Sequence, residues 1–198
     1  MEEDRLIRDE EKVEPVEIFC VVDRSGSMHS LVDDAIGGFN AMIEEQKKIP
    51  GEAYLTLATF DDKYDLVYEC KPLQEVPEAN LMTFQPRGST ALWDAVGKTL
   101  EAASKRIGSE RVIVVIITDG YENASSEYTA DQVKGIVKDC KDSSWEFLFL
   151  GANIDSFEVG GAMGFAANQT FDYGSSGRGV QTMYSNVSDT VGAFRNQR

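Results

Sequence analysis

The segment "VEIFCVVDRSGS", residues 16–27, changes character abruptly at its eighth residue. The largely apolar run from Val16 to Val22 is typical of a strand that is buried on both faces of a sheet. An acid and two serines follow at alternate positions, Asp23, Ser25 and Ser27. A tight turn can aim side-chain oxygens at such positions toward one point, and Gly26 allows the backbone to curl without a Cβ clash. The segment therefore predicts a strand that ends in a cluster of oxygen ligands.

The rest of the chain alternates helix-like and strand-like segments. Apolar residues recur at helical spacing within 31–43, 92–103, 133–140 and 180–194. The runs "RVIVVIIT" (111–118) and "WEFLFLG" (145–151) are typical of buried strands, and "AYLTLATF" (53–60) with "YDLVYEC" (64–70) predicts a hairpin. This order predicts a three-layer α/β/α sandwich of Rossmann-like type, with a mostly parallel central sheet and one antiparallel edge strand.

Local signals refine this outline. Thr129 and Gln132 form a capping-box pattern that opens the helix of 133–140, and Asp155 can cap a short helix that ends near "GGAMG". A brief strand is expected around "QTFDY" (169–173). The stretch "GSSGRG" (174–179) predicts a flexible loop before the last helix.

Size and charge limit the possible classes of protein. A chain of 198 residues that is 42% hydrophobic predicts one domain, residues 16–198, after a charge-dense tail, residues 1–15. The net charge of −15 argues against nucleic-acid partners and anionic membranes, because both require basic surfaces. The first 15 residues do not resemble a secretory signal and the longest apolar runs are too short to cross a bilayer, so we expect a cytoplasmic protein. Cys20, Cys70 and Cys140 are far apart in sequence and are expected to be ordinary small apolar residues.

Three segments are expected to meet at the carboxyl edge of the sheet, where α/β proteins bind ligands. These are "DRSGS" (23–27), "GST" (88–90) and "TDG" (118–120). Asp23, Ser25, Ser27, Thr90 and Asp119 then offer two carboxylates and three hydroxyls, without an imidazole or a thiolate. Such a donor set favours a hard cation, Mg²⁺ or Mn²⁺ and less readily Ca²⁺, over zinc.

These three motifs, in this order, resemble the metal-ion-dependent adhesion site of von Willebrand factor type A domains, and the resemblance extends over nearly the whole chain. It implies that Ser25, Ser27 and Thr90 are hydroxyl ligands and that Asp23 and Asp119 hold the ion, often through water. It also implies that the last coordination position is filled by an Asp or Glu carboxylate of a protein partner. The expected function is thus metal-dependent protein binding, not catalysis, in a stand-alone intracellular member that serves a multiprotein complex.

Two other functions remain open at this level. A magnesium-dependent phosphoester hydrolase also carries an aspartate at the end of its first strand, but it usually has a second acid nearby, where this chain has Ser25. The other alternative is a structural assembly protein whose site is inactive. Arg24 occupies the variable position of "DRSGS". Outside the three motifs, His29 is expected on the surface and Trp93 in the core.

The residues that follow Asp119 allow two interpretations. Tyr121, Glu122 and Asn123 either contact the partner from the rim of the site or form a plain polar loop.

Overall fold

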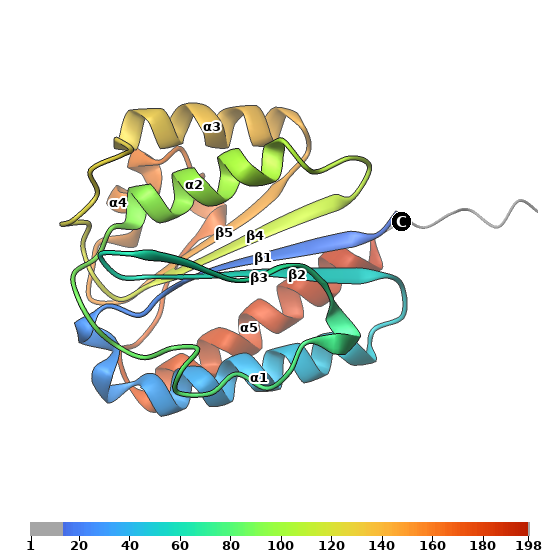
Figure 1. Cartoon of the computed structure of the whole chain (residues 1–198), viewed down its shortest axis with the longest axis horizontal. Helices are drawn as coiled ribbons and strands as arrows, with labels where there is room; N and C mark the ends of the chain where they lie inside the picture. Colours follow the sequence, from blue (N-terminus) through green and yellow to red (C-terminus); the bar gives the residue numbers. More distant parts are fainter. Residues whose placement is uncertain (1–13, 198) are drawn as a thin grey trace, which may run out of the picture.

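A six-stranded sheet runs through the middle of the molecule, with strand order β3-β2-β1-β4-β5-β6 (Figure 1). The computed structural model describes residues 14–197. Every pair of neighbouring strands is parallel except β2 and β3, which pair antiparallel at one edge. The strands are β1 (Val16–Asp23), β2 (Ala53–Phe60), β3 (Tyr64–Pro72), β4 (Arg111–Thr118), β5 (Glu146–Gly151) and β6 (Thr170–Asp172). The predicted mostly parallel sheet with an antiparallel edge is confirmed.

Helices cover both faces of this sheet, as predicted for a three-layer sandwich. In Figure 1, α2, α3 and α4 lie above the sheet, and α1 and α5 lie below it. The helices are α1 (Val32–Lys48), α2 (Leu92–Ser104), α3 (Ala130–Asp142), α4 (Ser156–Ala162) and α5 (Gly177–Asn196). None of the helices within residues 14–197 has the length and apolar character to span a bilayer.

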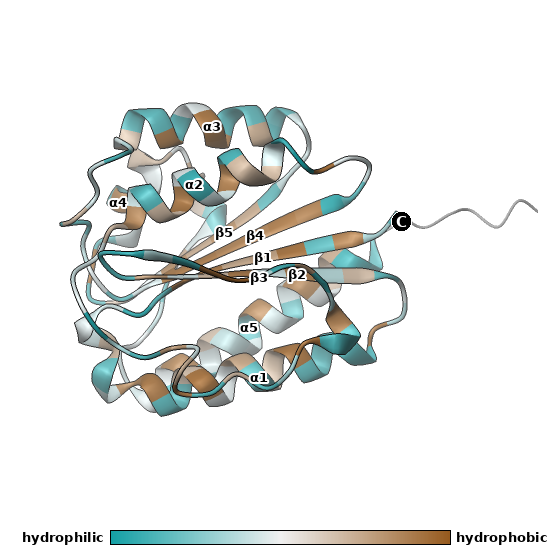
Figure 2. Cartoon of the chain, in the orientation of Figure 1, coloured by the Kyte–Doolittle hydropathy of each residue, from teal (hydrophilic) through white to brown (hydrophobic). Residues whose placement is uncertain are grey.

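Strand β1 explains why there are two separate cores. All eight of its residues are buried, and successive side chains point to opposite faces. Ile18 and Cys20 join the core between the sheet and helices α1 and α5. Phe19 and Val21 join the core between the sheet and helices α2 and α3. In Figure 2 the central strands are mostly hydrophobic, whereas many residues of the helices and loops are hydrophilic.

Most local signals were read correctly. The capping box of α3 is present, with the Gln132 backbone N–H donating to Thr129 Oγ1 at 3.3 Å and the Thr129 backbone N–H donating to Gln132 Oε1 at 2.8 Å. Asp155 caps α4 through the Glu158 backbone N–H at 2.9 Å. Cys20 and Cys140 are buried, and burial raises the pKa of the Cys20 thiol to about 12 and that of Cys140 to about 11.

Two local predictions need correction. The stretch "GSSGRG" is not all loop, because Ser176 caps α5 by accepting from the Gly179 backbone N–H at 3.2 Å, so Gly177 to Gly179 form the first helical turn. Trp93, predicted in the core, is only half-buried and packs at the edge of the core between the sheet and helices α2 and α3. Trp145 is buried in that core and stacks on Phe19, with ring centroids 6.0 Å apart. The predicted tail of residues 1–15 lies almost wholly outside the described residues.

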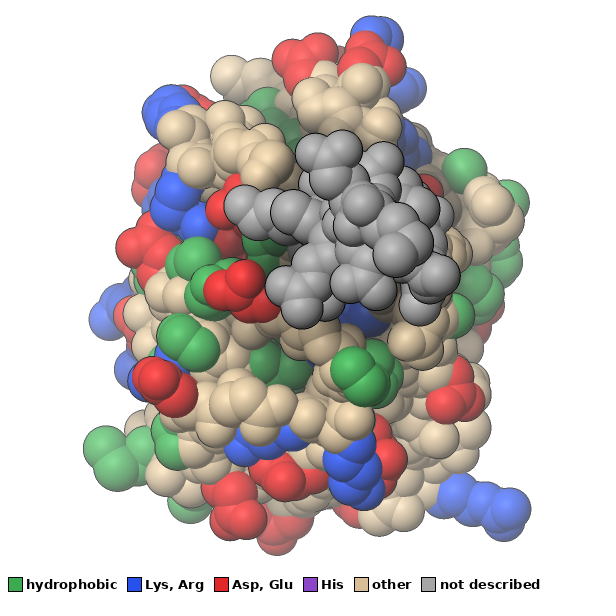
Figure 3. Space-filling model, turned by 90° about the vertical axis from the view of Figure 1, so that its right-hand side faces the viewer, with side chains coloured by type: hydrophobic (Ala, Val, Ile, Leu, Met, Phe, Trp, Pro, Cys, Tyr) green, Lys and Arg blue, Asp and Glu red, His purple; other side chains and the backbone are tan. Residues whose placement is uncertain are grey.

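Charged side chains of both signs are interspersed at the face formed by the N-terminal ends of the strands. Figure 3 shows this face, which is the right-hand side of the molecule in Figure 1. On the part not drawn in grey, lysines and arginines do not merge into a continuous basic patch. The described part of this face therefore does not present the broad positive surface that a phosphate backbone requires.

Helices α1 and α5 pack closely because α1 has a glycine at the contact. A Cβ on Gly38 would lie 2.5 Å from Cδ2 of the buried Tyr184, whereas a Cβ on Gly37 would meet nothing within 4 Å. The ring of Tyr184 in turn meets Phe39 edge-on, with centroids 6.3 Å apart. The position of the last helix thus depends on the absence of a Cβ atom at Gly38.

We expect Gly38→Ala to lower the free energy of unfolding by about 1–3 kcal/mol, because the new methyl group overpacks against Tyr184. Gly37→Ala is the matched control and should stabilise the protein by roughly 0.5–1 kcal/mol, since alanine favours the helix and meets open space. Urea unfolding measures both values. Equal effects of the two substitutions would contradict close packing of α5 on Gly38.

Candidate metal centre

The first loop of the predicted site leaves the carboxyl end of β1. Asp23, the last residue of the strand, is 1% exposed, and its Oδ1 accepts from the Ser25 backbone N–H at 2.6 Å. The chain then enters a short 3₁₀ turn, Gly26–Ser30, whose Met28 is buried. This turn leaves Ser25 Oγ and Ser27 Oγ 3.0 Å apart. The alternate spacing of Asp23, Ser25 and Ser27 therefore gathers three oxygen-bearing side chains at one place.

The second loop comes from β4, which is the neighbour of β1 in the sheet. Ser27 Oγ donates to Asp119 Oδ1 at 2.6 Å. Thr118, the last residue of β4, donates from Oγ1 to Asp23 Oδ2 at 2.6 Å. Each predicted carboxylate thus accepts a hydrogen bond from a hydroxyl group at the end of the other strand. Thr118 was missed at the sequence level, although it immediately precedes the "DG" pair.

The third loop carries Thr90, which lies just before α2. Its backbone N–H donates to Asn123 Oδ1 at 2.9 Å, and its carbonyl accepts from the Asn123 and Ala124 backbone N–H groups at 3.0 and 3.2 Å. A Cβ on Gly120 would lie 3.2 Å from Thr90 Oγ1 and 3.8 Å from Ser27 Oγ, so both hydroxyls border the same glycine. The structure therefore brings all five predicted side chains together.

The donor set suits a hard divalent cation. Among residues 14–197, no three His, Cys, Asp or Glu side chains cluster in a way that would hold a metal ion, so hydroxyls have to supply much of the coordination. In an octahedral shell with metal–oxygen bonds of 2.0–2.1 Å, adjacent oxygens are about 2.9 Å apart. The separation of 3.0 Å between the two serine hydroxyls is close to that value.

The family model of the von Willebrand factor type A domain matches residues 18–122. The chain belongs to this family. The matched region contains all five predicted site residues, from Asp23 to Asp119, and the three loops that carry them.

Solved structures share the type A fold at low sequence identity. The pilus adhesin SpaC from Lactobacillus rhamnosus GG has a TM-score of 0.71 and 16% identity over 91% of this chain. Proximal thread matrix protein 1 from the mussel byssus, solved with a zinc-occupied adhesion-site motif, has a TM-score of 0.65 and 14% identity over 91% of this chain. Manganese-loaded TRAP protein of Plasmodium vivax has a TM-score of 0.57 and 16% identity over 86% of this chain and 72% of its own.

These likenesses show the fold alone. The chain spans 30% of SpaC and 46% of the mussel protein, so it corresponds to one part of each. None of the curated proteins matches the chain.

Both site acids of this type A domain lie where a negative charge is unfavourable. Burial raises the pKa of Asp23 to about 6, with a smaller contribution from the charge of Asp119, against the hydrogen bonds from Thr118 and Ser25 that lower it. Burial also raises the pKa of Asp119, although hydrogen bonds from Ser27 and the backbone oppose it. A cation at this position would supply the positive charge that the two carboxylates lack.

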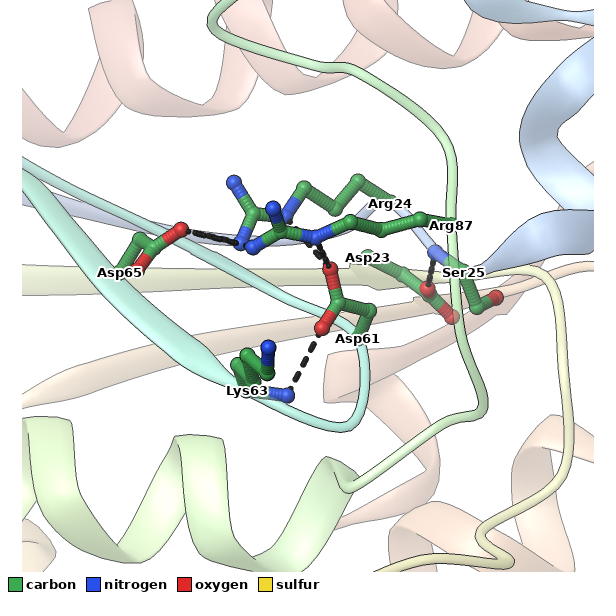
Figure 4. Close-up of polar contacts among 7 residues, drawn as sticks. All are labelled: Asp23, Arg24, Ser25, Asp61, Lys63, Asp65 and Arg87. Carbon is green, nitrogen blue, oxygen red and sulfur yellow. Dashed lines mark hydrogen bonds and ion pairs between the residues drawn. The ribbon is translucent and has the colours of Figure 1, made fainter.

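Arg24, expected to be merely variable, is buried. Its Nε donates to Asp61 Oδ2 at 3.0 Å, and its Nη2 pairs with Asp65 (Figure 4). Burial alone raises the pKa of Asp61, but hydrogen bonds from Arg87 and the Lys63 backbone and the charge of Arg24 outweigh it and lower the pKa below its ordinary value. No local sequence pattern predicts this pairing, because Arg24 and Asp61 lie 37 positions apart.

The residues of the loop after Asp119 differ in how they contact the rest of the domain. Glu122 accepts from the backbone N–H groups of Trp93, Ala124 and Ser125 at 2.6–3.0 Å and from the Ser125 hydroxyl at 2.6 Å. Glu122 is half-buried and its carboxylate is used within the loop and at the start of α2, which favours the interpretation as a polar loop for this residue. Asn123 binds Thr90 but is exposed, so contact with a partner stays a prediction for it. Tyr121 is 53% exposed, and its Oη accepts from the Asp155 backbone N–H at 3.1 Å.

The neighbours of Tyr121 and of the serine turn are also exposed. Phe157, two residues after Asp155, is exposed. His29 is exposed, as predicted.

We expect Glu122→Ala to lower the free energy of unfolding by about 1–3 kcal/mol, because four donors lose their acceptor. Glu127→Ala is the control from the same loop. It removes only an exposed ion pair with Lys98, so it should change stability by no more than about 0.5 kcal/mol. Chemical unfolding of both variants checks this difference, and a Glu122→Ala variant as stable as the wild type would contradict the inward role.

Proposed function

We propose that this chain is a divalent-cation-dependent protein-binding module that captures an Asp or Glu carboxylate of its partner. The observation that supports this proposal most directly is the meeting of Ser25, Ser27, Thr90, Asp23 and Asp119 at the carboxyl edge of the sheet. These residues come from three separate loops within the region that matches the type A family.

Each side chain has a distinct part in this proposal. The hydroxyls of Ser25, Ser27 and Thr90 are the neutral ligands, and Asp23 and Asp119 supply the negative charge directly or through water. A bound dication would attract a carboxylate, because only two formal negative charges and weakly donating hydroxyls surround it. Thr118 and the Ser25 backbone N–H keep the Asp23 carboxylate oriented through their hydrogen bonds.

Mg²⁺ is the cation we propose, with Mn²⁺ or Ca²⁺ as alternatives. The oxygen-only donor set favours such hard cations. The zinc-occupied motif of the mussel protein indicates that the donor set alone does not exclude zinc, so zinc belongs in the same comparison.

Protein binding is better supported than phosphoester hydrolysis. Both carboxylate oxygens of Asp23 accept hydrogen bonds, and within the described part of the chain neither Asp23 nor Asp119 receives one from a lysine or histidine. Ser25 also occupies the position at which such a hydrolase usually carries its second acid, so the described residues favour binding over phosphoryl transfer. Magnesium-dependent phosphatase activity that Asp23→Asn abolishes would contradict a purely binding role.

The setting of the module also remains a proposal. A cytoplasmic location and a place in a multiprotein complex are predictions from the sequence. The net charge of −15 further predicts a partner surface that is basic around its one captured acid, because opposite surface potentials favour encounter.

We expect Mg²⁺ or Mn²⁺ to raise the melting temperature of the wild type. Thr90→Val and Asp119→Asn should each weaken binding of the ion at least about tenfold, since the first removes a hydroxyl ligand and the second removes a negative charge. Thr182→Val and Asp189→Asn, on the exposed side of α5, are matched controls that should bind like the wild type. Calorimetric titration with Mg²⁺, Mn²⁺, Ca²⁺ and Zn²⁺ measures the affinities, and the absence of binding by all four would favour an inactive site.

Capture of partners from the host lysate tests the carboxylate. We expect a protein that is retained with Mg²⁺ and lost with chelator or with Thr90→Val as bait. Replacing one Asp or Glu of that protein by its amide should abolish retention. Tyr121→Ala should weaken capture without changing the melting-temperature shift with Mg²⁺, because Tyr121 lies at the exposed border of the site. Retention that survives chelation would contradict the proposed mode of binding.

A further inference from the structure

Four charged side chains form a network directly behind the proposed metal site. Asp61 accepts at Oδ2 from Arg24 Nε at 3.0 Å and from Arg87 Nε at 2.6 Å. Asp65 accepts from the Nη2 groups of both arginines, at 3.1 Å in the case of Arg87. Figure 4 shows the two guanidinium groups side by side between the two carboxylates. We refer to Arg24, Asp61, Asp65 and Arg87 as the charged quartet.

The quartet joins loops that carry different metal-site residues. Arg24 lies between Asp23 and Ser25, and Arg87 lies three residues before Thr90. Asp61 begins the turn between β2 and β3, and Asp65 is the second residue of β3. The turn contributes no residue to the proposed metal site. The two acids nevertheless bind an arginine from each of the two hydroxyl-bearing loops.

Backbone hydrogen bonds run along the same junction. The Arg24 N–H donates to the Phe60 carbonyl at 2.8 Å, and the Arg87 N–H donates to the Arg24 carbonyl at 2.9 Å. The Gly26 N–H donates to the Gly88 carbonyl at 3.2 Å. The Ala91 N–H, next to Thr90, donates to the Asp61 carbonyl at 2.8 Å. The serine loop and the threonine loop are therefore attached to each other and to the β2–β3 turn.

The burial of the quartet makes this attachment sensitive to its charges. Asp61 is 0% exposed and Arg24 is 5% exposed, whereas Arg87 is 44% exposed. A buried carboxylate that loses a partner keeps its desolvation cost, so the loops are expected to rearrange when one arginine is removed. Arg87 is the best residue to change, because its side chain is partly in solvent and the fold does not depend on burying it.

We propose that the charged quartet is a positioning network that sets the spacing between the Ser25 and Ser27 hydroxyls and the Thr90 hydroxyl, and thereby the affinity of the site for its cation. This inference rests on the proposed function. In this proposal the quartet residues do not coordinate the cation themselves. Arg24, Arg87 and Asp61 affect it through the positions of the loops to which they are hydrogen-bonded.

Electrostatics alone predicts the opposite effect of removing Arg87. Loss of a positive charge near a cation site should strengthen cation binding or, with screening by salt, leave it unchanged. A positioning role predicts weaker binding, because the hydroxyl ligands are no longer held at the required spacing. The direction of the change in affinity therefore separates the two explanations.

The experiment titrates Mn²⁺ into the wild type, Arg87→Met and Arg87→Lys by calorimetry. We expect Arg87→Met to weaken Mn²⁺ binding about tenfold. Arg87→Lys keeps the charge but not the two-pronged guanidinium, so an intermediate affinity is expected. In the metal-free proteins, the Gly26 amide should exchange its hydrogen faster in Arg87→Met than in the wild type, because its bond to Gly88 is loosened. Arg87→Met that binds Mn²⁺ as tightly as the wild type, or more tightly, overturns the inference.

Arg106→Met is the matched control. Arg106 is also partly exposed and binds a fully buried acid, Glu17, with Nη–Oε distances of 2.9 and 2.5 Å, but it lies at the opposite end of the sheet. This variant should lose thermal stability while its Mn²⁺ affinity stays within about twofold of the wild type, since no metal-site loop is attached to it. An equal loss of Mn²⁺ affinity in Arg106→Met and Arg87→Met would contradict the positioning role, because the quartet would then only stabilise the fold in general.

The outcomes also separate this inference from the function on which it rests. If the wild type does not bind Mn²⁺, the proposed function and the positioning role both fail. If the wild type binds, Thr90→Val does not, and Arg87→Met is unchanged, the metal site stands and only the positioning role fails.

Discussion

The pairing of β1 and β4 is the constraint on which the candidate site depends. Because the two strands are parallel neighbours, they end at the same edge of the sheet, and Asp23 and Asp119 must emerge close together. The hydrogen bond from Thr118 to Asp23 and that from Ser27 to Asp119 then connect the two strand ends. The same register that buries the apolar side chains of β1 and β4 thus also brings two carboxylates close together. A cation or a proton can balance their negative charge.

The parts of this arrangement that are local in sequence could be predicted. Apolar periodicity located the helices, continuous aliphatic runs located β1 and β4, and the capping residue Thr129 marked the start of α3. The five site residues were found because each lies next to a recognisable strand or helix and because the order of their motifs resembles that of a known family. Their use of a metal remains a prediction.

What escaped prediction depends on contacts between distant segments. Arg24 looked like a variable residue, since its partner Asp61 lies 37 positions away in a turn that has no motif. Glu122 looked like a surface residue, since its inward direction depends on how the loop after β4 folds against the start of α2. The first turn of α5 was taken for loop because glycines weaken a helix, yet the close approach of Gly179 to Gly174 leaves no room for a Cβ there.

The charges around the site indicate how a strongly acidic domain can bind an acidic group. The quartet contains two arginines and two aspartates, so its ion pairs join the loops without adding net charge beside the proposed cation site. The remaining excess of acid, part of the net charge of −15, acts on a partner only within about 8–10 Å at physiological salt. At shorter range, a dication held mainly by hydroxyls as proposed would dominate, because those ligands would not neutralise it. On the proposed function, selection of the partner would therefore combine a long-range preference for a basic surface with short-range capture of one carboxylate, and a uniformly acidic protein would satisfy only the second condition.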